Sequence, residues 1–261
     1  MARALRGLFL LAAFFVLSPV AAQDMEHPPP PKAAPLVEVQ EMPLPRAGGV
    51  MVFGATGELG TEIVRALREQ GVSVSAMVRP TSDTAQLEEL GAKLAVGDAM
   101  TYADVLNAMR SYPLRAVVST LGGRRGDYRV DVGGNKNVID AAAEVGVPRF
   151  VLVTAIGSGE GSEALPWYID LFMGYYFEAK SAAELVLKNS GLDFTIVRPG
   201  WLIDAPASGA ARLIGDIDRF SWIARADLGA MIAAAIEDET TYGKALTAFD
   251  PERTSILSLF D

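Results

Sequence analysis

From Val50 onward, short apolar runs alternate with longer segments whose apolar residues recur at helical spacing. Strands are predicted at 50–53, 72–78, 94–96, 115–120, 149–154, 194–197 and 245–249. Helices are predicted at 58–70, 87–90, 103–109, 130–145, 167–188 and 227–236. Strands that alternate with helices form a parallel sheet with crossover helices on both faces. The pattern therefore predicts an α/β fold, a doubly wound parallel sheet in a single domain over residues 50–261.

The residues before this domain have a different character. Residues 1–22 read as a secretory signal, with Arg3 and Arg6 ahead of an apolar run at 8–17 and a small-residue cleavage region that ends at Ala22. An uncleaved anchor that associates the chain with a membrane is the alternative, although the run is short for a spanning helix. Residues 23–49 hold seven of the fifteen prolines and predict an extended linker. We expect export by the general secretory route, or a cytoplasmic protein if Met25 is the true start.

Composition excludes several kinds of chemistry. The chain has no cysteine, and its one histidine, His27, lies in the Pro-rich linker. The predicted domain therefore has no thiol nucleophile, no histidine triad and no Cys/His metal site. A formal net charge of −9 argues against nucleic acid as a partner. Chemistry must come from Tyr, Lys, Ser/Thr, carboxylates or a bound cofactor; the oligomeric state and the identity of any substrate are left open.

A glycine motif follows the first predicted strand and opens the first predicted helix. Gly54 permits a tight exit from the strand, Gly57 lets backbone approach a pyrophosphate, and Gly60 permits close packing of helix on sheet. The start of the helix offers free amides and a positive dipole end to phosphates. The alternative is a turn with only a structural role. We expect a Rossmann-type dinucleotide site that includes Gly54, Thr56, Gly57, Glu58, Leu59 and Gly60.

The spacing Gly-x-x-Gly-x-x-Gly resembles that of the short-chain dehydrogenase/reductase superfamily, and more narrowly its atypical NAD(P)H-binding branch of NmrA-like and flavin-reductase-like proteins. The resemblance covers about residues 50–250. It rests on the sequences Val-Phe-Gly-Ala-Thr-Gly-Glu-Leu-Gly at 52–60, Val-Arg at 78–79, Val-Gly-Asp at 96–98, Asp-Val-Gly-Gly-Asn-Lys-Asn-Val-Ile-Asp-Ala at 131–141, Lys180 with Ala183-Glu184, and Ile-Val-Arg-Pro-Gly at 196–200.

The end of the second strand bears on the choice of cofactor. NAD enzymes place an acidic residue there to bond the ribose 2′-hydroxyl, whereas this chain has Arg79, with Ser82 close behind. A guanidinium suits a 2′-phosphate, so NADP(H) is expected in preference to NAD(H). The alternative for Arg79 is a solvated surface charge.

Two later strand ends complete the expected nucleotide site. The family resemblance implies that Asp98 bonds the adenine amino group; the alternative is a helix cap, shared with Thr101. Thr120 and Leu121, after the fourth strand, would line the ribose side of the cofactor, or belong to a plain loop.

The reactive residues are implied by the same resemblance. Tyr176 and Lys180 form a Tyr-x-x-x-Lys pair on one helix face, in which the lysine lowers the pKa of the tyrosine and bonds the nicotinamide ribose while the tyrosine protonates a carbonyl. Thr154 or Ser158 supplies the accompanying hydroxyl, and Pro199 places backbone beside the nicotinamide. An aromatic helix packed on a core would explain Tyr176 without chemistry. Residues 157–175 are the expected substrate wall.

Two functions follow from these residues. The first is an NADP(H)-dependent oxidoreductase that transfers hydride to a small-molecule acceptor, namely a carbonyl, a quinone or a flavin-like molecule. The second is a non-catalytic NADPH-binding sensor or assembly scaffold. The Tyr176–Lys180 pair favours the enzyme, and Thr-Ala at 154–155 in place of the family's serine pair favours the scaffold.

Overall fold

A computed structural model describes residues 47–123, 127–160, 167–215 and 219–254. The chain divides into residues 1–33 and 34–261, and every described residue belongs to the second unit. The expected signal and nearly all of the expected linker lie outside the described residues. Within these ranges, none of the helices combines the length and the hydropathy that crossing a membrane requires.

One eight-stranded sheet organises the domain, in the order β3-β2-β1-β4-β5-β6-β10-β8. Its pairs are parallel except for β8, which runs antiparallel to β10 at one edge. β7 and β9 pair in a separate two-stranded ribbon. The strands are β1 (Gly49–Phe53), β2 (Val74–Val78), β3 (Lys93–Val96), β4 (Leu114–Ser119), β5 (Arg149–Val153), β6 (Asp193–Pro199), β7 (Trp201–Ile203), β8 (Arg212–Ile214), β9 (Trp222–Ala224) and β10 (Lys244–Phe249).

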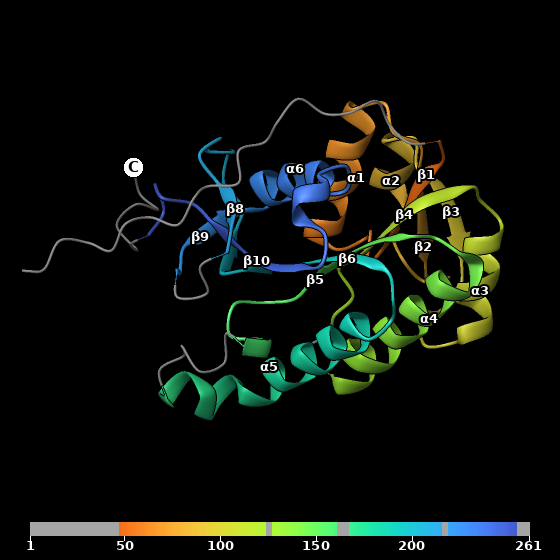
Figure 1. Ribbon diagram of the computed structural model, residues 1–261. Coiled ribbons are helices and arrows are strands. Elements are labelled where there is room, and N and C mark those ends of the chain that lie inside the picture. Colours follow the sequence, from red (N-terminus) through yellow and green to blue (C-terminus); the bar gives the residue numbers. More distant parts are fainter. Residues whose placement is uncertain (1–46, 124–126, 161–166, 216–218, 255–261) are drawn as a thin grey trace, which may run out of the picture. The chain divides into compact units, whose positions relative to one another are not determined.

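Helices cover both faces of the sheet (Figure 1). They are α1 (Glu58–Glu69), α2 (Ala85–Glu89), α3 (Tyr102–Arg110), η1 (Arg129–Gly134), α4 (Asn135–Val145), α5 (Trp167–Lys188), α6 (Arg225–Ala235) and η3 (Glu239–Thr241). Buried residues of α1, α2 and α6 share one core cluster, and those of α3, α4 and α5 share the other. The doubly wound, Rossmann-like fold predicted from the alternation is confirmed.

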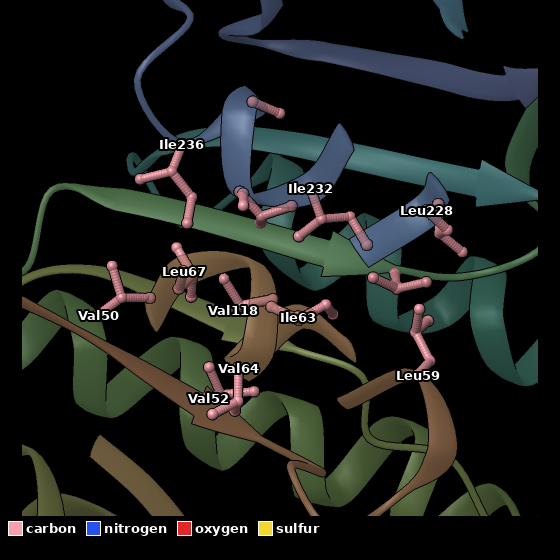
Figure 2. Close-up of a cluster of buried hydrophobic side chains, with 14 of the residues drawn as sticks. Val50, Val52, Leu59, Ile63, Val64, Leu67, Val118, Leu228, Ile232 and Ile236 are labelled. Carbon is pink, nitrogen blue, oxygen red and sulfur yellow. The ribbon is translucent and has the colours of Figure 1, made fainter. Parts of the chain in front are cut away.

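The two cores follow from the alternation of side chains along each strand. Val50 and Val52 of β1 enter one cluster, whereas Met51 and Phe53 enter the other. Figure 2 shows the first cluster, in which apolar residues of α1 and α6 meet above the valines of the sheet. Gly229 of α6 makes this approach close, because a Cβ there would lie 2.9 Å from backbone atoms of Glu62.

Three features depart from the predicted elements. The short strands β7, β8 and β9 were not predicted, because each has only three residues, too few to show a period. The predicted helix over 130–145 begins as a π-helix, η1, before it continues as α4. The last helix was predicted to begin at Asp227, but α6 begins at Arg225. Asp227 lies inside its first turn, where its carboxylate accepts hydrogen bonds from the amides of Ser208 and Gly209.

Candidate functional site

A cavity of about 700 Å³ opens at the carboxyl ends of β1, β2, β3 and β4. Its volume is in the range of pockets that hold small molecules and cofactors. Seven of the predicted cofactor residues line it: Gly54, Thr56, Gly57, Arg79, Asp98, Thr120 and Leu121. Residues that the sequence did not single out complete the wall, among them Met77, Met100 and Val130.

The glycine turn after β1 forms one side of this cavity. Gly54 has φ +78°, a left-handed conformation that favours glycine, and a Cβ there would lie 2.5 Å from Thr120 Oγ1. A Cβ at Gly60 would lie 2.2 Å from the carbonyl oxygen of Gly54, so the helix packs directly on the turn. Gly57 has no side chain with which to cap α1, and the first amides of the helix are left for a ligand.

Three residues of the motif, Glu58, Leu59 and Gly60, do not line the cavity. Gly60 acts through its missing side chain, and Leu59 is buried in the core between α1 and α6. Glu58 points elsewhere: its carboxylate lies 2.7 Å from the guanidinium of Arg225, and it borders a second, more open hollow of about 470 Å³. The structure therefore places the Glu58 side chain against Arg225 and outside the cavity.

Arg79 and Asp98 place opposite charges along the cavity. Both side chains are exposed. Within the described residues, the guanidinium of Arg79 takes part in no hydrogen bond or ion pair, and Ser82 lines the cavity beside it. Asp98 Oδ1 accepts a hydrogen bond from the amide of Met100 at 2.9 Å and does not cap α3, whose N-cap residue is Thr101.

Lys180 lies behind the cavity wall and is held there. Its Nζ lies 2.7 Å from Asp131 Oδ1 and donates to the carbonyl oxygen of Leu121 at 3.2 Å. A Cβ at Gly122 would lie 2.9 Å from the same Nζ, so the lysine packs against the back of the wall at a position without a side chain. Both partners are buried, with side-chain exposures of 6% for Lys180 and 0% for Asp131. The ammonium thus forms an enclosed ion pair directly beneath the wall at 121–123.

Asp131 and Asn135 were not recognised as site residues from the sequence. Asp131 Oδ2 accepts from the amide of Gly123 at 2.8 Å. Asn135 Nδ2 donates to the carbonyls of Asp131 and Leu121, and its Oδ1 accepts from Ser119 Oγ at 2.6 Å. These bonds fasten the loop after β4 to η1 and α4. The sequence did contain a sign of this role. The two polar residues are four positions apart, which places them on one face of a helix, in a segment that otherwise supplies apolar residues to the core.

Tyr176 is partly buried, and its environment differs from the expected one. Lys180 Nζ lies 5.7 Å from the centre of the tyrosine ring, and Phe177 packs on the ring edge-on at 5.5 Å. Burial, and then the negative charge of Asp131, raise the pKa of Tyr176 above its ordinary value. The expectation that Lys180 lowers this pKa is wrong, because the lysine's charge is paired with Asp131 and the carboxylate acts on the phenol in the opposite direction.

The other predicted reactive groups are engaged in structure. Thr154 is buried, and its hydroxyl donates to Glu184 Oε1 at 2.8 Å. Glu184 in turn receives two hydrogen bonds from the guanidinium of Arg198. Ser158 is fully buried, and its Oγ has no hydrogen-bond partner within the described part of the chain. Pro199 is buried and its carbonyl accepts from the amide of Ile156, so it does not line the cavity.

The expected substrate wall is only partly visible. Residues 161–166 lie outside the described residues, and so do the side chains of 167–172. The first described part runs from residue 157 to Glu160, whose carboxylate bonds both Arg198 and Lys188. These two bonds lower the pKa of Glu160 to about 2. At the other end, Tyr175 is exposed and lies 6.0 Å from the ring of Tyr128.

Comparisons with known proteins agree with this geometry. The family model described as NAD(P)H-binding matches residues 54–239. An uncharacterised sugar epimerase, YhfK, of Bacillus subtilis is 30% identical over 206 residues, which cover 75% of this chain and 91% of that protein. The photosystem II assembly factor Ycf39 of Cyanophora paradoxa is 33% identical over 153 residues, covering 57% of this chain and 44% of that one.

A solved structure extends the likeness to three dimensions. ChuY, described as an anaerobilin reductase from Escherichia coli O157:H7, superposes with a TM-score of 0.72 at 27% identity and covers 79% of this chain and 99% of its own. The fold, the glycine turn and these matches agree with one another. The chain belongs to the NAD(P)H-binding family of atypical, NmrA-like short-chain dehydrogenases/reductases.

Proposed function

We propose that this protein is an NADP(H)-dependent oxidoreductase that transfers hydride to a small-molecule acceptor. One observation carries the proposal. At the carboxyl end of β2, in the wall of a cavity that the glycine turn borders, Arg79 holds a guanidinium engaged by no group in the described residues. A cation left open at that strand end fits a 2′-phosphate, which would accept paired charge-assisted hydrogen bonds from it.

Each part of the cavity has a distinct task in this proposal. The glycine turn lets backbone approach a pyrophosphate, and the open amides of α1 bind it. Thr120 and Leu121 line the wall that leads to Lys180. Bound reduced nicotinamide supplies the hydride, and the acceptor takes up its proton from solvent or from the protein. The residues at 119–123 are kept rigid by Asp131 and Asn135, which fixes the geometry of that wall.

The test is a fluorescence titration of the full chain with NADPH and, separately, with NADH. Saturable binding that favours NADPH, and that Arg79→Ala weakens about tenfold or more for NADPH alone, is the expected result. Arg110→Ala is the matched control, because Arg110 is an exposed arginine on α3, outside the cavity, that pairs with Glu144. Equal affinity for both nucleotides would contradict the NADP preference, and binding of neither would contradict the proposal as a whole.

A non-catalytic NADPH-binding sensor or assembly protein is the second candidate. It is favoured by the engagement of Thr154 with Glu184 and by the raised pKa of Tyr176, which leave the family's acid poorly prepared. Cofactor oxidation with a panel of quinones, flavins and aldehydes separates the two functions. Turnover that survives Tyr176→Phe would remove the tyrosine mechanism and keep the enzyme. No oxidation with any acceptor would favour the sensor.

We also propose that the protein is exported. The support is the ordered pattern of basic, apolar and small residues over 1–22. Blotting of cell fractions with the measured size of the processed chain tests this proposal. A shortened chain outside the cytoplasm is expected, whereas a cytoplasmic chain that begins at Met25 would contradict it.

A further inference from the structure

Asp131 lies beside Lys180, which in turn lies beside Tyr176; we call this group of residues the reactive end of the site. The two carboxylate oxygens of Asp131 have separate partners, Lys180 Nζ at 2.7 Å and the amide of Gly123 at 2.8 Å, and the side chain is fully buried. The carboxylate is thus enclosed away from water, with a cation beside one oxygen and an amide donating to the other. The lysine therefore faces a full negative charge at contact distance.

This arrangement decides which charge governs Tyr176. Lys180 lies 5.7 Å from the centre of the phenol ring, and its charge is offset by the nearer carboxylate. Burial and Asp131 both act to keep the phenol protonated. A phenol in such a place gives up its proton reluctantly, because the phenolate that remains would be desolvated and would face Asp131.

Other described hydroxyls near the end of β5 do not replace it. The Thr154 hydroxyl donates to Glu184, and that carboxylate is fixed by Arg198. Ser158 is fully enclosed and lies outside the cavity wall. A proton donor for a substrate must come within hydrogen-bond reach of the atom that it protonates.

We propose that Asp131 is a positioning residue that holds Lys180 in an ion pair, offsets its charge at Tyr176 and thereby restricts the protein to acceptors that hold the transferred electron pair in their own conjugated system, such as quinones and isoalloxazines. This inference rests on the proposed function for its chemistry. The inference adds two points to the proposed function: a residue that determines specificity, and the exclusion of isolated aldehydes and ketones as acceptors.

The exclusion follows from where the electrons go. Hydride addition to an isolated carbonyl forms a C–H bond and moves the π electron pair of C=O onto one oxygen, which then needs a proton from a nearby acid. In a quinone or an isoalloxazine the pair is spread over several atoms, and solvent supplies the proton afterwards. In both cases the reduced nicotinamide loses two electrons with the hydride and is oxidised.

The first experiment measures the ionisation of the Tyr176 phenol and needs no cofactor. Alkaline titration of phenolate absorbance, taken as the difference between each background and the same background with Tyr176→Phe, isolates Tyr176 from the other six tyrosines. Asp131→Asn is expected to lower its midpoint by about one pH unit. The matched control is Asp140→Asn, which removes a carboxylate of α4 that pairs with Lys136 on the surface; it is expected to leave the midpoint unchanged.

A second variant keeps the test possible if Asp131→Asn alone does not fold. Asp131→Asn leaves Lys180 buried without its partner, whereas Asp131→Asn with Lys180→Met leaves no unpaired buried charge. The midpoint of Tyr176 is expected to fall in this double variant too, because the carboxylate that raises it is gone. An unchanged midpoint in whichever of these variants is folded would overturn the inference.

Turnover then tests the consequence for acceptors. The wild type is expected to oxidise NADPH with menadione or FMN but not with benzaldehyde, and the surface control Asp140→Asn is expected to leave those rates unchanged. Asp131→Asn is expected to oxidise NADPH with benzaldehyde about a hundredfold faster than the reaction without enzyme, and Tyr176→Phe in the same background is expected to abolish this activity. Benzaldehyde turnover by the wild type would overturn the inference. Failure of NADPH to bind would instead overturn the proposed function, and the phenol titration would be unaffected.

Discussion

The two ends of the site hold their cations in opposite ways. At the nucleotide end, Arg79 is exposed at the end of β2 and no group in the described residues engages it. At the reactive end, Lys180 is buried, forms an ion pair with Asp131 and donates a hydrogen bond to the carbonyl of Leu121. The charge of Arg79 is therefore available for a ligand, whereas the charge of Lys180 is already paired within the protein.

Substitutions at the nucleotide end are therefore expected to change ligand binding, whereas substitutions at the reactive end are expected to change stability. An exposed, unpaired cation contributes little to folding and much to the capture of an anion. A buried ion pair contributes to folding only as a pair, since either partner alone is an unsolvated charge. Four predictions, in order of decreasing effect, test this contrast.

Removal of the lysine is expected to have the largest effect. Lys180→Met leaves Asp131 buried without its cation, and we expect the free energy of unfolding to fall by about 4 kcal/mol. Urea unfolding followed by circular dichroism measures it. Asp131→Leu with Lys180→Met is expected to recover much of the loss, because both charges are then gone. A double variant no more stable than Lys180→Met would show that the two residues are not coupled.

A methyl group in the glycine turn is expected to follow. Gly60→Ala places a Cβ 2.2 Å from the carbonyl oxygen of Gly54, so α1 must shift away from β1, at a cost of about 3 kcal/mol. NADPH binding should be lost with the turn. Gly215→Ala is the control, because a Cβ there meets nothing within 4 Å. Equal thermal midpoints for these two variants would disprove the close contact.

Glu160 gives a smaller effect that depends on pH. Its pKa is about 2 in the folded chain, below the ordinary 4.5, so its contribution is present above pH 4.5 and disappears as pH falls toward 2. Its side chain is 66% exposed, so solvent screening limits the loss in Glu160→Gln to about 0.5 kcal/mol at pH 7. Unfolding of wild type and variant at pH 7 and pH 3 should show the difference shrinking. A constant difference would refute the ion pair.

Arg79→Ala is expected to have the smallest effect on stability. With no ion pair or hydrogen bond to lose within the described residues, the free energy of unfolding should change by less than about 0.5 kcal/mol. The same variant weakens NADPH binding, so the two measurements together separate a ligand-binding cation from a structural one. A loss of stability as large as that of Lys180→Met would erase the contrast between the two ends.

The sequence predicted the glycine turn and the place of Arg79 at a strand end, for a local reason. Gly54 and Gly60 are glycines because backbone atoms lie where a side chain would be, and Arg79 directly follows a strand whose alternation with helices is plain. Such relations span only a few residues along the chain, so the motif itself records them. Glu58 is the exception, since its partner Arg225 lies at the start of α6.

The reactive end was predicted less well because its contacts are distant in sequence. Lys180 meets Asp131 across 49 positions, and Thr154 meets Glu184 across 30. Tyr176 and Lys180 do share a helix face, as their spacing predicted. Asp131, which pairs with Lys180 and raises the pKa of Tyr176, belongs to another helix, η1. Spacing within one element could not reveal that the pKa of Tyr176 is raised and not lowered.

The π-helix η1 makes the reactive end sensitive to chain length as well as to residue type. Each residue of an ordinary helix advances the chain by about 100° around its axis. A π-helical turn holds one residue more than an α-helical turn, and such turns are commonly found at functional sites. Loss of Gly133 would convert the turn to α-helix and rotate what precedes it relative to α4. A single-codon deletion could thus separate Asp131 from Lys180 while leaving every site side chain in the sequence.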